Sequence, residues 1–174
     1  NVGKSTLFNR IIGAREAIVD DLPGVTRDRK YADTDWAGKR FTIIDTGGYV
    51  PESSDVFEQA IREQAEIAIE EADCVLFVVD AGEGILPLDK EIAGILRKSE
   101  KPIHVIVNKI DSARRESAAN EFFELGLGEP LQISALVGRR IGDFLDVITK
   151  DFVHNGREER NEQRLRLAIV GKPN

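Results

Sequence analysis

The sequence has no methionine and only one cysteine, one tryptophan and two tyrosines in 174 residues. A single thiol, Cys74, excludes an internal disulfide framework and is typical of a protein that works in a reducing cytoplasm. No apolar run approaches the roughly 20 residues of a membrane-spanning helix, so we expect no membrane contact. Basic residues are outnumbered, at 24 Lys and Arg against 31 Asp and Glu, and the net charge of −7 disfavours a broad nucleic-acid-binding face.

Short apolar runs alternate with segments of helical period, and 41% of the residues are hydrophobic, enough for a buried core. This alternation predicts an α/β fold with a mostly parallel sheet, whose ligands bind at the carboxyl ends of the strands. Strands are predicted at 29–36 (an edge strand), 40–45, 74–80, 103–108, 131–134 and 165–170. Helices are predicted at 56–71, 88–96 and 141–148, and Ala37 to Lys39 form a hairpin turn between the first two strands.

The N-terminal segment matches the second half of the phosphate-binding pattern G-x-x-x-x-G-K-[ST]. It consists of Asn1, Val2, Gly3, Lys4, Ser5 and Thr6. In such a loop, backbone amides at a helix N-terminus face the phosphates. Lys4 would neutralise the β- and γ-phosphates, and the Ser5 hydroxyl would bind Mg²⁺. Taken alone, this short segment could equally begin an ordinary helix after a glycine turn.

Two further segments provide groups for a metal ion and a terminal phosphate. Asp45 ends a predicted strand and can hold Mg²⁺ through water, while the amide of Gly48 can meet a γ-phosphate. Thr26 lies in a Pro-Gly-Val-Thr-Arg-Asp segment, and its hydroxyl and carbonyl could close over the same ion and phosphate. Each feature alone is also typical of an ordinary turn or loop.

The segment Asn108-Lys109-Ile110-Asp111 ends another buried strand and predicts guanine recognition. The Asp111 carboxylate could accept hydrogen bonds from guanine N1–H and the 2-amino group, neither of which adenine offers in that position. Lys109 could lie along the base and ribose. A second loop would present backbone amides to guanine O6, and it contains Ser134, Ala135 and Leu136. A turn with a solvated charge is the alternative interpretation of 108–111 alone, and the second loop is a weak signal in isolation.

These segments occur in the order and spacing of the Ras-like GTPases of the translation-factor class, which predicts a three-layer GTPase fold. The residues of four of these motifs resemble one family more closely. This family is Der, also called EngA, and its members are bacterial GTPases with two GTP-binding domains in tandem. The similar segments are Asn-Val-Gly-Lys-Ser, Pro-Gly-Val-Thr-Arg-Asp, Asp-Thr-Gly-Gly and Asn-Lys-Ile-Asp.

The resemblance to Der implies GTP hydrolysis coupled to assembly of the large ribosomal subunit, with GTP or GDP and Mg²⁺ bound. It implies that Lys4, Thr26 and Gly48 are catalytic, and that Ser5, Thr26 and Asp45 serve the magnesium ion. Tyr49 stands where Ras-like enzymes keep a water-orienting glutamine. The family uses K⁺ near the phosphates, which implies Asn1 as the potassium ligand. Asn1 could instead only shape the loop.

The resemblance also implies a domain plan. Residues 1–149 resemble a first GTPase domain without its first strand, 150–164 a charged linker, and 165–174 the first strand and half phosphate loop of a second domain. The sequence begins at Asn1 and stops at Asn174, and these two asparagines occupy the same position of the phosphate-binding pattern. We therefore expect the sequence to be one period of a tandem repeat. Strand 165–170 could fill the central slot of the sheet within its own chain or in a second copy.

Two kinds of function therefore stay open. The first is a GTP-hydrolysing switch, whose ribosome contact is made through the full-length protein and not by direct RNA binding of this domain. The second is a non-catalytic fragment or interaction module, which keeps the fold but binds nucleotide weakly because its phosphate loop is incomplete.

Overall fold

The computed structural model describes residues 2–13, 18–20, 30–46, 54–150, 152 and 164–172. Strands and helices alternate along most of this chain, as predicted. The strands are β1 (Ile18–Asp20), β2 (Lys30–Trp36), β3 (Lys39–Asp45), β4 (Cys74–Asp80), β5 (Ile103–Asn108), β6 (Leu131–Gln132) and β7 (Leu165–Val170). The α-helices are α1 (Lys4–Ile12), α2 (Ser54–Glu71), α3 (Pro87–Leu96) and α4 (Ile141–Ile148), and η1 (Ala113–Leu125) is a 3₁₀-helix.

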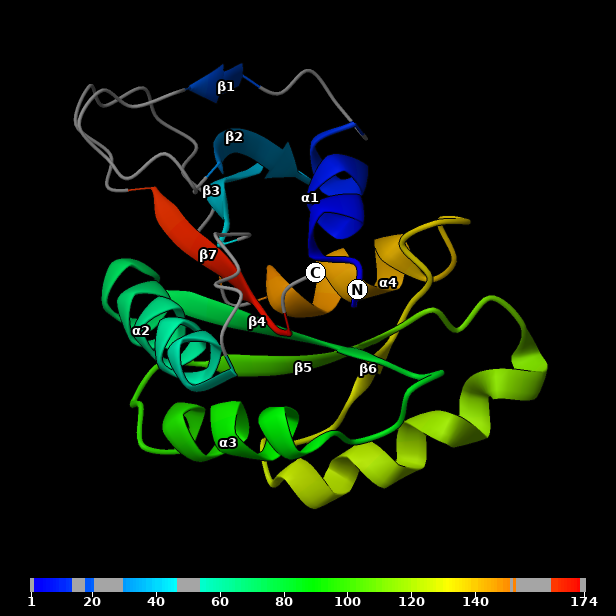
Figure 1. Ribbon diagram of the computed structural model, residues 1–174. Coiled ribbons are helices and arrows are strands. Elements are labelled where there is room, and N and C mark those ends of the chain that lie inside the picture. The colour runs from blue at the N-terminus through cyan, green and yellow to red at the C-terminus, as the bar shows by residue number, and fades with distance from the viewer. Residues whose placement is uncertain are drawn as a thin grey trace.

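All seven strands form one sheet in the order β1-β2-β3-β7-β4-β5-β6. Strands β3, β7, β4, β5 and β6 are parallel, and only β1 and β2 join antiparallel. The last strand, β7, lies in the centre between β3 and β4 (Figure 1). The mostly parallel α/β sheet is therefore confirmed, with the C-terminal strand in its central slot.

The antiparallel end of the sheet differs from the prediction in one respect. The hairpin between β2 and β3 is confirmed, and both turn residues, Ala37 and Gly38, have positive φ angles of 50° and 80°. Two such residues are the signature of a tight hairpin turn. However, β2 is not the edge strand, because the short strand β1 pairs with its outer side.

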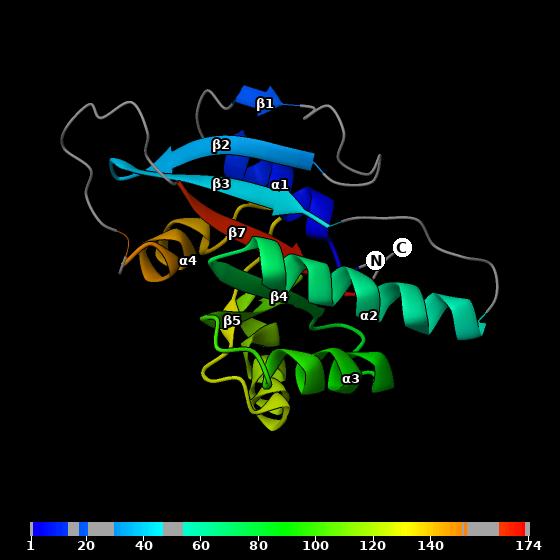
Figure 2. The ribbon, with the colours of Figure 1, turned by 90° about the vertical axis from the view of Figure 1, so that its left-hand side faces the viewer.

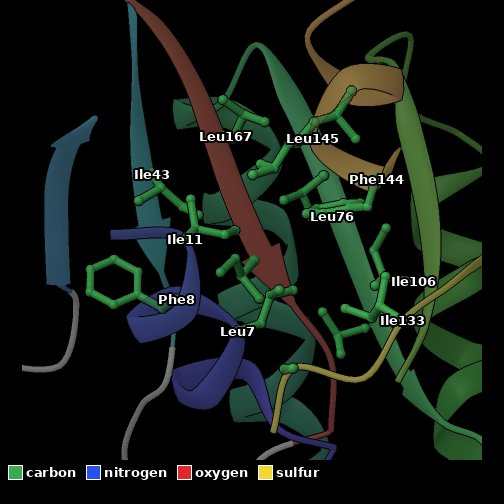
Figure 3. Packing of buried hydrophobic residues seen from close by; sticks show 14 of the residues in the cluster. Leu7, Phe8, Ile11, Ile43, Leu76, Ile106, Ile133, Phe144, Leu145 and Leu167 are labelled. Carbon is green, nitrogen blue, oxygen red and sulfur yellow. The ribbon is translucent and has the colours of Figure 1, made fainter. Parts of the chain in front are cut away.

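The sheet is covered on both faces, which gives three layers (Figure 2). Helices α1 and α4 pack on one face, and α2, α3 and η1 pack on the other. Successive residues of β4 alternate between the two cores, so the whole strand is buried. Figure 3 shows the first core, where Leu7, Phe8 and Ile11 of α1 lie near Ile43, Leu76 and Leu167 of the sheet.

The predicted helices are confirmed, while η1 was missed. Its buried residues, Ala119, Phe122 and Leu125, are three apart, the period of a 3₁₀-helix. Cys74 at the start of β4 is buried, and this burial raises the pKa of its thiol to about 12. In the described part of the chain, no helix combines the length and apolarity needed to cross a membrane.

Candidate nucleotide-binding site

Most of the predicted site residues lie at one edge of the sheet. The carboxyl ends of parallel strands point to the same edge, and the register places Asp45 of β3 opposite Ile169 of β7, and Asp80 of β4 opposite Asn108 of β5. Segments that are more than 100 residues apart in sequence therefore meet there. Helix α1 begins at the same edge, close to the last described residues of the chain (Figure 1).

Lys4 joins the two halves of the phosphate-binding pattern. Its ammonium group donates hydrogen bonds to the carbonyl oxygens of Gly171, at 3.0 Å, and Lys172, at 2.9 Å. The side chain is buried, and this desolvation lowers the pKa of Lys4 to about 8, although the negative charge of Asp45 opposes the shift. Lys4 is also the first residue of α1, at the positive end of the helix dipole. This is a cationic cradle that suits a phosphate group.

The start of α1 depends on a glycine and carries no side-chain cap. Gly3 precedes the helix with φ at 93°, and no side chain caps the first turn. A Cβ atom at Gly3 would lie 2.5 Å from the Asn108 amide nitrogen, so only glycine fits there. The first-turn amides therefore have no side-chain cap, and Ser5 is exposed.

Gly171 allows the other half of the cradle to form. Its φ is 155°, and a Cβ atom there would lie only 2.3 Å from the carbonyl oxygen of Val78 in β4. Beside it, the Thr46 hydroxyl donates to the carbonyl oxygen of Ile169 at 2.5 Å, which ties the end of β3 to β7. Asp45 itself is buried at this edge, and its negative charge interacts with the Lys4 ammonium.

Asn108 connects the cradle to the predicted base-recognition loop. Its side-chain amide donates to the carbonyl oxygen of Val2 at 2.9 Å, and its side-chain oxygen accepts from the Ala135 amide, also at 2.9 Å. Asn108 is buried, so both bonds are sheltered from water. This residue therefore holds two parts of the site together.

The neighbouring residues are also held in place. The Ser134 hydroxyl donates to Oδ1 of Asp111 at 2.6 Å, which orients an exposed carboxylate. Lys109 has a positive φ of 68° and forms an ion pair with Asp80 at 2.5 Å, where Asp80 is buried. Leu136 is 71% exposed beside this loop.

Two residues of this network were not predicted from the sequence. Asp80 ends an apolar strand as Asp45 and Asn108 do, and that shared position could have identified it. Arg10 of α1 donates to the carbonyl oxygens of Ala135 and Leu136, a contact that no sequence pattern signals. Three predicted residues lie outside the described residues: Asn1, Thr26 and Gly48.

Within the described ranges, no group of three or more His, Cys, Asp or Glu residues could hold a metal ion by itself. Magnesium at phosphate sites commonly takes only one or two protein oxygens and completes its shell with phosphate and water. Ser5 and Asp45 are oxygen donors of that kind at the cradle. They fit a magnesium ion that arrives with a nucleotide.

Comparison with known proteins identifies the family. A family described as 50S ribosome-binding GTPase matches residues 1–109. The chain belongs to this family. Its resemblance to Der is also confirmed, since it is 51% identical over 174 residues to GTPase Der of Clostridium kluyveri and 53% identical to that of Clostridium tetani. These matches cover all of this chain, and the chain spans 40% of the length of each relative.

Solved structures confirm the GTPase fold. Era in complex with MgGDPNP and a segment of 16S ribosomal RNA superposes with a TM-score of 0.69 at 32% identity, over 95% of this chain and 57% of Era. Aquifex aeolicus Era bound to GDP and aluminium fluoride gives the same values. The cytosolic domain of Thermotoga maritima FeoB has the same fold, with a TM-score of 0.61 at 23% identity over 93% of this chain and 63% of FeoB.

Proposed function

We propose that this GTPase-family chain binds GTP and GDP with Mg²⁺ and hydrolyses GTP to GDP and phosphate. The observation that carries the proposal is the convergence of the phosphate-loop and guanine-recognition segments at one sheet edge, where Lys4 is buried. A buried ammonium that donates to two neutral carbonyls, on the first residue of a helix, is stabilised further when an anion joins it. The solved Era complexes, which hold guanine nucleotides, support the same ligand class.

The proposed binding roles follow the motifs. Val2, Gly3, Ser5 and Thr6 surround the phosphates, with Lys4 as the charged partner. Asp111 receives the two donors of guanine, and its orientation by Ser134 supports that role. The Lys109 stem flanks the base while Asp80 restrains its head group. The amides of Ala135 and Leu136 are the proposed partners of guanine O6.

The proposed catalytic roles concern charge at the transferred phosphate. Lys4, Thr26 and Gly48 would stabilise it, and Ser5, Thr26 and Asp45 would position the magnesium ion. Asn1 would hold K⁺ beside the β- and γ-phosphates, where a cation supplies what an arginine finger supplies elsewhere. Equal GTP turnover in sodium and potassium buffers would rule out the potassium role.

At the level of the whole protein, we propose a switch domain that acts in biogenesis of the large ribosomal subunit in the cytoplasm. The resemblance to Der supports this role. In this plan 1–149 are the first GTPase domain, 150–164 a linker and 165–174 the start of a second. With a net charge of −7, the ribosome contact would depend on other parts of the full-length protein, and not on direct RNA binding here.

The alternative is a fragment that keeps the fold but binds nucleotide weakly. The closed contact between Lys4 and the 171–172 backbone favours binding, because the cradle has both halves present. Titration with fluorescent GDP separates the two functions. Saturable binding supports the switch, and no saturable binding supports the alternative.

The decisive experiment changes the base preference of the site from guanine to xanthine. In Asp111→Asn, the new amide can donate to the 2-oxo group of xanthine, and it can no longer accept both guanine donors. We expect GDP binding to weaken about 10- to 100-fold and xanthosine diphosphate binding to improve. Asp143→Asn, an exposed change on α4, is the matched control and should leave both affinities unchanged. Unaltered GDP binding by Asp111→Asn would contradict the proposed base site.

A further inference from the structure

Arg10 reaches from the phosphate-binding helix to the loop proposed to read the base. It lies near the C-terminal end of α1, while Lys4 begins the same helix. Its Nε donates to the Ala135 carbonyl oxygen at 2.8 Å, and its Nη2 donates to the Leu136 carbonyl oxygen at 2.5 Å. The planar guanidinium therefore holds two consecutive carbonyls at once, which a lysine ammonium on a flexible stem does less well.

These two bonds fix the amides as well as the carbonyls. A peptide group is planar and trans, so each carbonyl points opposite to the N–H of the next residue. Holding the Ala135 carbonyl toward α1 therefore directs the Leu136 N–H away from α1. Holding the Leu136 carbonyl likewise sets the Val137 N–H, which donates to the Ser134 hydroxyl at 3.3 Å. Asn108 already fixes the Ala135 N–H.

We propose that Arg10 is a positioning residue for guanine recognition, which aims the Leu136 amide at the 6-oxo group of the base. This inference rests on the proposed guanine-nucleotide function of the site. It assigns Arg10 a share in selectivity at position 6 of the base only, because the 2-amino group is read by Asp111. Arg10 thereby links the helix that holds the phosphates to the loop that reads the base.

A purely structural role for Arg10 makes a different prediction. A basic residue in the last turn of a helix also favours the helix dipole, and a tie between α1 and the loop adds stability. Loss of those effects would lower the stability of the fold and weaken every nucleotide alike. Selectivity at one position of the base is the readout that a structural role would not move.

The test compares three diphosphates that differ at single positions of the base. Inosine diphosphate lacks only the 2-amino group of GDP, and 6-thioguanosine diphosphate replaces only O6 by sulfur, a weak acceptor. Competition against fluorescent GDP gives each affinity for the whole chain. In Arg10→Met we expect GDP and inosine diphosphate to weaken about tenfold together, and 6-thioguanosine diphosphate by less than about threefold.

Arg40→Met is the control, since it removes an exposed arginine near the start of β3, at the opposite end of the strand from Asp45. It should leave all three affinities unchanged. Equal weakening of all three nucleotides in Arg10→Met, or no change in any, overturns the inference. Should that variant fail to fold, Arg10→Lys keeps the charge but not the fork and is expected to lose the same selectivity in part. If the unaltered protein binds no GDP, the proposed function is wrong. If the unaltered protein binds GDP and Arg10→Met keeps the same selectivity, only the inference about Arg10 is wrong.

Discussion

The double role of Asn108 leads to a prediction with a pH signature. Its amide nitrogen donates to the Val2 carbonyl oxygen while its oxygen accepts from the Ala135 amide, both at 2.9 Å. Asn108→Asp conserves the shape and keeps the acceptor for Ala135. It replaces the donor by a carboxylate oxygen that faces the Val2 carbonyl oxygen. At neutral pH, two buried acceptors therefore face each other with no proton between them.

The magnitude follows from the lost bond and the unpaired groups. A buried hydrogen bond contributes about 1 kcal/mol, and leaving a buried acceptor unpaired, here beside a buried charge, costs about 2–3 kcal/mol more. We therefore expect Asn108→Asp to lower the free energy of unfolding by about 3–4 kcal/mol at pH 8. With a urea m-value of about 2 kcal/mol per molar, the unfolding midpoint falls by about 1.5–2 M.

Acid should reverse part of this loss. When the introduced carboxyl is protonated, its O–H can donate to the Val2 carbonyl, so the native state favours the protonated form and the carboxyl pKa rises on folding. The native state then binds more protons than the unfolded chain above about pH 3.9, the ordinary carboxyl value, and the variant loses stability as pH increases from there. The gap between variant and unaltered protein is thus small near pH 4.5 and large at pH 8.

Urea unfolding followed by Trp36 fluorescence at pH 4.5, 6 and 8 measures this gap. Asn120→Asp introduces the same charge at an exposed position of η1, and we expect a change of no more than about 0.5 kcal/mol at every pH. A gap for Asn108→Asp that is the same at pH 4.5 and pH 8 would show that no proton is needed between position 108 and Val2. The assigned direction of the two hydrogen bonds would then be wrong.

Two further predictions concern the cradle. Gly171→Ala should cost about 2–4 kcal/mol in urea unfolding, because its Cβ would press on the Val78 carbonyl, whereas Gly142→Ala, which meets only the Trp36 ring at 3.8 Å, should not destabilise; equal effects would contradict the close approach. For Lys4, the native pKa of about 8 lies below the unfolded value, so the native state holds fewer protons between about pH 8 and 10.4. The unaltered protein should therefore gain about 3 kcal/mol relative to Lys4→Met over that range, and parallel pH profiles would refute the burial of its charge.

The sequence was sufficient for the strands that are buried on both faces. Every residue of β4 and four of the six residues of β5 are buried, so a continuous apolar run marks each strand and its ends closely. The antiparallel end of the sheet is harder to predict from the sequence. Strand β1 has three residues, and its pairing with β2 depends on an approach in space that no local period encodes.

Strand β6 shows a second reason for a shift in boundaries. It was expected to reach Ser134 but ends at Gln132. The backbone of Ser134 instead pairs with Arg139 in an isolated bridge, and its hydroxyl bonds Asp111. These contacts turn the chain out of the sheet two residues early. The bend that serves the site thus competes with continuation of the strand, and a propensity argument sees only the strand.

The position of the motif residues at this edge of the sheet was predictable, but the partners that they take there were not. Asn108 bonds backbone groups on two sides, and Lys109 bonds Asp80. A motif specifies a residue type at a position and does not specify which partner it takes. Arg10 is the extreme case, since its partners are carbonyl oxygens 125 and 126 residues away, and every residue has a carbonyl.

The central position of β7 connects the stability of the fold to the site. Without β7, the facing edges of β3 and β4 would leave a row of buried backbone groups unpaired, which is costly. The same strand delivers Gly171 and Lys172 to the Lys4 ammonium. The pairing of β7 therefore completes both the sheet and the cradle. It follows that any ligand that binds the closed cradle also stabilises the pairing of β7, and that a change which loosens β7 weakens the ligand through the sheet rather than through a direct contact.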